Sequence, residues 1–153
     1  MGNLKRLNLE NYPSFITTKT INNYPFFNNP ENAEILISTL YFGRENNWFS
    51  LIAFVVMSDH LHLIIIPQKK NISQAMHSTK SFSSKAINKI NKRNGRIWQP
   101  SFRDFTIYTR EILLEKINYI HNNPMRKGLV SEADSYSFSS ANPAYETDIS
   151  IVL

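Results

Sequence analysis

Residues 49–67, with the sequence FSLIAFVVMSDHLHLIIIP, contain two apolar runs separated by the polar pair Ser58 and Asp59. Each run has the length of a strand, and neither is long enough to span a membrane. The first run is apolar for most of its length, which is typical of a central strand covered on both faces. We therefore predict strands over residues 49–57 and 60–67, joined by a tight turn.

A strand and a helix are predicted before this hairpin. Residues 12–20 are rich in β-branched and aromatic side chains, which favours a first strand. Asn29 and Pro30 form a helix start, with Asn as the N-cap and Pro at the first helical position. The helix carries an apolar stripe, and Gly43 is its predicted end. The stripe consists of Ala33, Leu36, Ile37, Leu40 and Tyr41.

After the hairpin, an amphipathic helix is predicted over about residues 73–94. Its predicted inner side consists of Ile72, Met76, Phe82, Ala86, Ile87 and Ile90. A last strand is expected within residues 97–108, followed by a helix that Thr109 caps and that ends near Asn123, before Pro124. The polar tail, residues 131–153, is expected to cover the surface.

The predicted order is therefore β-α-β-β-α-β-α. This is the α+β, ferredoxin-like split β-α-β-β-α-β arrangement, an antiparallel sheet with helices packed on it and an additional C-terminal helix. We expect one domain over residues 1–153, with a core at about 10–130. Such a fold hosts many functions and assigns none by itself.

Composition excludes several classes of protein. The chain has 153 residues and no cysteine, so disulfides, thiolate zinc sites and a cysteine nucleophile are all excluded. The first ten residues lack the apolar core of a signal peptide. We expect a soluble cytoplasmic protein that associates with the nucleoid and not with a membrane.

The net charge of +5 is unevenly distributed along the chain. Between Lys69 and Arg103 there are nine basic residues and no Asp or Glu. A run of charge is usually a solvated helix face. Because this one contains no acid, it favours a polyanionic partner such as nucleic acid.

Among the four histidines, only His60 and His62 have a spacing that would bring their side chains together. Residues two apart in a strand point to the same face, with Cα atoms about 6–7 Å apart, so two imidazoles can converge on one divalent ion. A His-x-His pair on a strand is more often structural than metal-binding. If it does bind metal, two histidines without cysteine indicate an open site suited to Mg²⁺ or Mn²⁺ rather than a closed zinc site.

Tyr119 lies on the last predicted helix, beside the apolar stripe of that helix. Asn123 is four residues further on and therefore shares its face. A phenol can attack phosphorus and form a covalent phosphotyrosine, although most tyrosines at such positions simply help a helix to dock. Tyr108 is a weaker rival nucleophile.

Three segments together resemble the single-tyrosine HUH transposases, the insertion-sequence 200-like family, and most closely their REP-associated tyrosine transposases. The segments are FVVMSDHLHLI at 54–64, IWQPSFRD at 97–104 and YIHNNPMRKGLV at 119–130. The resemblance covers about residues 10–142 with motif order and spacing intact. It departs at Ser58 and Asp59, where the family usually has Pro and Asn.

The resemblance implies a reaction. Tyr119 would be the nucleophile, His60, His62 and Asn123 would hold Mg²⁺ or Mn²⁺, and the substrate would be single-stranded DNA near hairpins, left with a 5′-phosphotyrosine. Candidates for binding the DNA backbone come from the basic helix and its surroundings. They are Lys80, Lys85, Lys89, Lys92, Arg93, Arg96, Arg103, Arg126 and Lys127.

Two other functions remain possible from the sequence. One is a ferredoxin-like nucleic-acid-binding protein, derived from a transposase, that does not cut. The other is a transposase-derived structural protein with buried histidines. The sequence also leaves open whether the protein is a monomer or a homodimer, and whether the tyrosine acts on its own chain's metal or its partner's.

Overall fold

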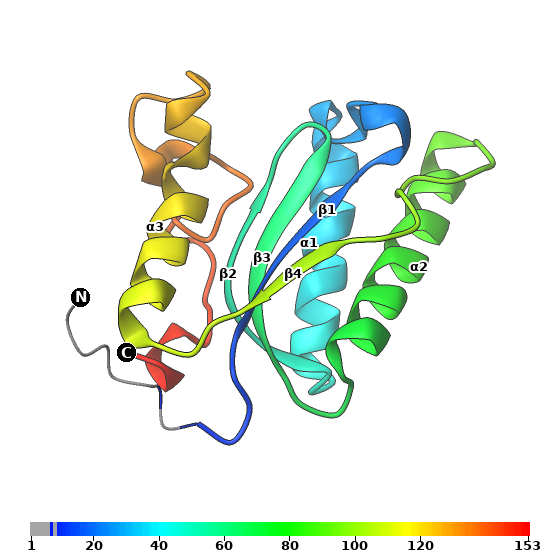
Figure 1. Cartoon of the computed structure of the whole chain (residues 1–153). Helices are drawn as coiled ribbons and strands as arrows, with labels where there is room; N and C mark the ends of the chain where they lie inside the picture. Colours follow the sequence, from blue (N-terminus) through cyan, green and yellow to red (C-terminus); the bar gives the residue numbers. More distant parts are fainter. Residues whose placement is uncertain (1–6, 8) are drawn as a thin grey trace.

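The structure, a computed structural model, describes residue 7 and residues 9–153 (Figure 1). Its elements follow the predicted β-α-β-β-α-β-α order. They are β1 (Ser14–Lys19), α1 (Pro30–Glu45), β2 (Phe49–Val56), β3 (His60–Pro67), α2 (Ile72–Asn91), β4 (Arg103–Thr106) and α3 (Arg110–Arg126). None of the helices in the described part of the chain is long and apolar enough to cross a membrane.

The four strands form one antiparallel sheet in the order β2-β3-β1-β4. Helices α1 and α2 lie on one face of the sheet and α3 lies on the other (Figure 1). The predicted ferredoxin-like α+β fold is thus confirmed.

Both faces of the central hairpin are buried, and alternate residues serve different cores. Leu61 and Leu63 belong to the cluster under α1 and α2. Ile64 and Ile66 belong to the cluster under α3. Because both sides of β2 and β3 are covered, continuous apolar runs were required there.

Two predicted helix caps are confirmed. Asn29 accepts a hydrogen bond from the backbone N–H of Glu31, with Pro30 in the first turn. Thr109 Oγ1 accepts one from the N–H of Ile112. Each side chain pairs an N–H that the helix itself leaves without a partner.

Gly43 does not end the first helix, which continues to Glu45. An added Cβ at Gly43 would lie 2.7 Å from both Phe49 Cζ and Trp48 Cε3. This glycine is therefore a packing residue, which lets the start of β2 approach the helix closely.

The predicted ends of the other two helices also need correction. Helix α2 ends at Asn91, because Lys92 adopts a left-handed conformation (φ 52°). Helix α3 runs past Pro124 to Arg126. Pro124 removes one helical hydrogen bond without ending the helix. The chain turns away at Gly128 (φ 75°), where Leu129 N–H donates to the Pro124 carbonyl at 2.9 Å.

The predicted inner side of α2 is only partly right. Met76 and Ile87 are buried, but Phe82 and Ile90 are 44% and 49% exposed. The other buried positions of the helix are the small residues Ala75, Thr79 and Ser83, and Ser83 Oγ accepts a hydrogen bond from the indole N–H of Trp98 at 3.0 Å.

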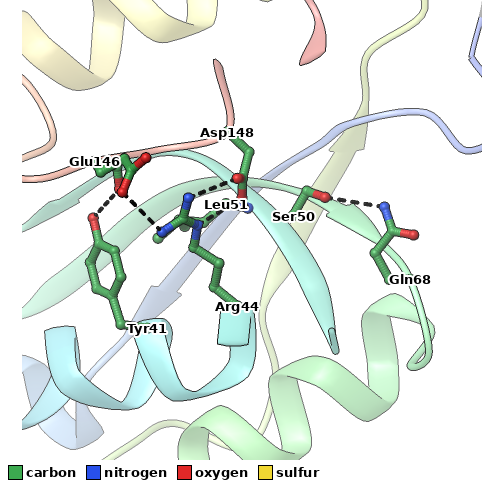
Figure 2. A network of polar contacts seen from close by, with 7 residues as sticks. All are labelled: Tyr41, Arg44, Ser50, Leu51, Gln68, Glu146 and Asp148. Carbon is green, nitrogen blue, oxygen red and sulfur yellow. Dashed lines mark hydrogen bonds and ion pairs between the residues drawn. The ribbon is translucent and has the colours of Figure 1, made fainter. Parts of the chain in front are cut away.

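The C-terminal tail covers the outer edge of β2. Val56 N–H donates to the Phe138 carbonyl at 2.8 Å, and Ser140 N–H donates to Phe54 at 3.0 Å. Further along, Asp148 accepts two hydrogen bonds from Arg44 and one from the N–H of Leu51 (Figure 2). An open edge strand is a template for pairing with other chains, so the tail has a more specific role than the predicted surface cover.

Candidate functional site

His60 and His62 lie on the α3 side of the sheet, at the start of β3. Their ring centroids are 4.7 Å apart. Thr17 pairs with His62 across β1 and β3, and its Oγ1 lies 2.8 Å from His62 Nδ1. The two imidazoles lie side by side on one face of the sheet, and a neighbouring strand fixes the orientation of one of them.

The second imidazole is oriented by its own chain neighbour. Asp59 Oδ1 lies 2.7 Å from His60 Nδ1. A carboxylate can only accept, so His60 donates from Nδ1, and in a neutral imidazole this leaves the lone pair on Nε2. The Nδ1 contact between Thr17 and His62 likewise leaves Nε2 of His62 for another partner.

His62 is electrically neutral at physiological pH. Burial, and then the charge of nearby His60 and two lysines, lowers the pKa of His62 to about 3. A neutral imidazole is the form that binds a metal ion.

Tyr119 joins the histidines from α3. Its ring centroid lies 5.4 Å from that of His62 and 5.9 Å from that of Phe15, which stacks on His62 at 5.5 Å. The Tyr119 side chain is 38% exposed, and the Arg126 guanidinium lies 5.2 Å from its ring centroid. One chain alone therefore brings the tyrosine to the histidine pair.

These side chains surround a pocket of about 600 Å³. Among the described residues, its walls carry four cationic side chains, from Lys19, Arg103, Lys116 and Lys127, and one carboxylate, from Asp59. Phe15, Thr17, Asn23, His60, His62 and Tyr119 complete the lining. An excess of positive charge around two imidazoles and a phenol suits a phosphate group.

The donor set fits a divalent cation in an open site. Asn123, one helical turn beyond Tyr119, is 5% exposed, and its Oδ1 has no hydrogen-bond partner among the residues that the structure describes. A buried acceptor without a partner is costly, and a cation or a water would satisfy it. Asn123 does not line the pocket itself. Across the described residues no group of three His, Cys, Asp or Glu could hold a metal, so a closed site of those ligands is absent there.

The predicted DNA-binding residues separate into two groups. Arg103 and Lys127 line the pocket, and Arg126 lies against Tyr119. The others are on α2 or just after it, across the sheet from Tyr119, and none of them lines the pocket (Figure 1). This second group is Lys80, Lys85, Lys89, Lys92, Arg93 and Arg96.

Lys80 has a structural role in the described chain. Its Nζ donates to the carbonyls of Gln99 (2.9 Å) and Ser101 (2.8 Å), which fastens α2 to the segment before β4. Burial lowers the pKa of Lys80 to about 8.

Sequence reasoning missed Phe15, Thr17, Lys19 and Lys116. Lys116 precedes Tyr119 by three residues, so helical spacing could have found it. The β1 residues could not be found this way, because the sequence of neither strand by itself determines which residues of β1 and β3 pair. Tyr108, the rival nucleophile, stacks edge-on with Tyr12 at 5.0 Å and does not line the pocket.

Known proteins resemble the chain in sequence and fold. Residues 14–123 match the family described as IS200-like transposases. A solved REP-associated tyrosine transposase bound to a REP hairpin is similar over 97% of this chain and 93% of its own, with TM-score 0.73 and 21% identity. A candidate transposase from Deinococcus radiodurans R1 covers 80% of this chain and 97% of its own, with TM-score 0.56 and 20% identity. At these identities the solved structures show a shared fold. No curated protein matches the sequence significantly.

Proposed function

Because the chain belongs to the IS200-like transposase family, we propose that it is a metal-dependent enzyme that cuts and rejoins single-stranded DNA through Tyr119. The family assignment agrees with the resemblance carried by the three sequence motifs. The observation that carries the proposal is the pocket in which the rings of His60, His62 and Tyr119 meet, with centroids 4.7 and 5.4 Å apart.

Mg²⁺ or Mn²⁺ is the proposed cofactor. His60 Nε2 and His62 Nε2 would hold it from the pocket wall, and Asn123 Oδ1, which lies outside the pocket lining, would be a third ligand only if its side chain turned toward the histidines. The remaining positions would be left to water and substrate. When bound, the cation would polarise the scissile phosphate and stabilise negative charge on its oxygens. The protein's own lysines and Arg103 would hold the same phosphate from the other walls.

Tyr119 is the proposed nucleophile. Its phenol oxygen forms a bond to phosphorus while the bond from phosphorus to the 3′-oxygen breaks. The phenol gives up its proton, the 3′-oxygen gains one, and the DNA remains attached to the protein as a 5′-phosphotyrosine. The reverse attack by a DNA 3′-hydroxyl reseals the strand without an external energy source, since one phosphoester bond is exchanged for another.

A hairpin next to a single-stranded segment is the proposed substrate. The similar solved transposase is bound to a REP hairpin, and the basic pocket of this chain suits a nucleic-acid backbone. Since one chain supplies all the site residues, we expect cleavage in cis by a monomer.

The experiment is a covalent-adduct assay. Full-length protein, hairpin-bearing single-stranded DNA and Mg²⁺ or Mn²⁺ are mixed, and a denaturant-resistant adduct is expected. Tyr119→Phe and the double substitution His60→Ala with His62→Ala should abolish it. Tyr108→Phe, outside the pocket, should retain it. Adduct formation by Tyr119→Phe would show that the nucleophile is wrongly assigned.

The same assay separates the two non-catalytic alternatives. Salt-sensitive hairpin binding without an adduct under any divalent cation would indicate a binding protein. No DNA binding and no rise in thermal stability with added cation would indicate a structural protein, because a ligand that binds only the folded state must stabilise it.

A further inference from the structure

A turn with unusual backbone geometry borders the site pocket. Asn22 and Asn23 both have φ of 53°, a left-handed conformation that asparagine tolerates better than most residues. The turn presents Tyr24, which is 59% exposed, the most exposed aromatic side chain among the large apolar residues of the described chain. Residues held in sparsely populated backbone conformations cluster at functional sites.

This turn is held firmly against the turn that carries His60. Thr20 N–H donates to the Asp59 carbonyl at 2.9 Å, and Phe27 N–H donates to the Ser58 carbonyl at 3.0 Å. Within the turn, Thr20 Oγ1 donates to the Tyr24 carbonyl at 2.8 Å. The Tyr24 backbone is therefore fixed relative to the histidine pair, so a nucleotide bound there would need little reordering of the protein.

A second pocket, of about 650 Å³, lies on the other side of the same turn. Asn23 lines the site pocket, whereas its chain neighbours Asn22 and Tyr24 line the second one. None of the described residues that line the second pocket is acidic. One strand of DNA could thus pass from one pocket to the other over a single turn of the protein.

Arg93 provides a fixed cation at the second pocket. Its Cζ lies 4.8 Å from the ring centroid of Phe26, and its Nη1 donates to Asn88 Oδ1 at 2.6 Å. Within the described chain no carboxylate lies within ion-pair distance of Arg93. Its remaining N–H groups can therefore pair with a phosphate, which a guanidinium recognises well.

We propose that Tyr24 and Arg93 form a second DNA subsite, which holds one unpaired nucleotide of the strand whose scissile phosphate lies at Tyr119. The base stacks on Tyr24 and a backbone phosphate pairs with Arg93. Any of the four bases can stack on an aromatic ring, so this subsite distinguishes unpaired from paired DNA rather than one sequence from another. The inference rests on the proposed function, and it assigns to two residues the recognition of the single-stranded segment.

The test measures binding in the absence of cleavage. Protein carrying Tyr119→Phe, in EDTA, is titrated with a bare hairpin and with hairpins that carry a single-stranded extension on the 5′ or the 3′ side. Tyr24→Ala should weaken binding of one extended hairpin about tenfold and leave the bare hairpin unchanged. Tyr24→Phe should restore binding. Phe82→Ala, which removes another exposed ring from the far helix α2, is the matched control and should have no effect.

A fluorescent base locates the nucleotide. 2-Aminopurine placed at successive unpaired positions should be quenched at one position, and Tyr24→Ala should relieve that quenching. Arg93→Gln should weaken binding of the same extended hairpin and reduce its salt dependence. Equal affinities and equal fluorescence profiles with and without Tyr24 would overturn the subsite while leaving the cleavage proposal intact. Loss of the adduct in the wild type would instead overturn the cleavage proposal.

Discussion

The contact between Thr17 Oγ1 and His62 Nδ1, at 2.8 Å, determines which nitrogen of His62 faces the pocket. Removing such a partner of a metal-ligating histidine typically costs about 10–100-fold in metal affinity or activity. For Thr17→Val we therefore expect adduct formation to require about tenfold more Mn²⁺, with a smaller change in the rate at saturating cation.

Thr18→Val is the matched control for this prediction. Thr18 is the next residue of β1, it is 1% exposed, and its Oγ1 has no hydrogen-bond partner in the described part of the chain. Its replacement should leave the Mn²⁺ dependence unchanged and should not lower stability. A Thr17→Val protein with the wild-type Mn²⁺ requirement would show that the hydroxyl does not position His62.

Lys80 gives a pH prediction at the residue scale. Its pKa is lowered by burial from 10.5 to about 8, so above pH 8 the unfolded chain holds this proton more tightly than the folded protein does. Stability from this group should therefore rise between about pH 8 and 10.5, by no more than about 1 kcal/mol after allowance for solvent screening. The check is urea unfolding at pH 7.5 and 10 for wild type and Lys80→Gln, whose difference isolates Lys80 from the tyrosines. A pH-independent difference would contradict it.

At this scale the sequence predicted the side chains that a periodic pattern can place. His60 and His62 share a face because strand residues two apart always do, and Tyr119 lies beside the stripe of Leu113, Ile117 and Ile120 on α3. Phe15 and Thr17 were beyond prediction, because they reach the site through the pairing of β1 with β3.

The features of a helix or strand that depend on its own sequence were predicted well. The features that depend on how it packs against other elements were predicted less well. The caps Asn29 and Thr109 act through their own helices and were correct. The basic helix α2 was predicted to bind DNA from its charge alone. Charge density says nothing about which face of the sheet a helix covers. Helix α2 lies on the face opposite α3 (Figure 1), and no residue of α2 lines the site pocket.

The prediction at the scale of elements concerns the packing of α1 against β2 at Gly43. The position of this glycine in α1 would favour alanine by intrinsic propensity, but the added Cβ would come within 2.7 Å of Phe49 and Trp48. Because both rings are buried, the clash requires α1 and β2 to move apart. Gly43→Ala should destabilise the protein by about 1–3 kcal/mol, measured by urea unfolding. Ser38→Ala, at an exposed position of the same helix, should be neutral or stabilising, and a stabilised Gly43→Ala would refute the packing role.

On the scale of the whole molecule, the tail completes a sheet that would otherwise have β2 as an open edge. Arg44 on α1, Leu51 on β2 and Asp148 in the tail meet at one carboxylate (Figure 2), with hydrogen bonds of 2.8–3.0 Å. The sequence could predict a polar tail on the surface. It could not predict this junction, since the residues lie about a hundred positions apart.

We therefore expect that loosening the tail lowers the stability of the fold and also promotes self-association of the protein. Asp148→Ala leaves the half-buried Arg44 and the N–H of Leu51 without their carboxylate, so we expect a loss of about 2 kcal/mol in the free energy of unfolding. Because the released tail exposes the β2 edge, the variant should also form oligomers at high concentration, detected by light scattering. Glu146→Ala is the control: its carboxylate lies 4.0 Å from Arg44 and is 84% exposed, so its removal should cost less than about 0.5 kcal/mol. Destabilisation without association would mean that the edge stays covered when the junction is lost, and that other tail contacts, such as the backbone bonds of Phe138 and Ser140 to β2, suffice to close it.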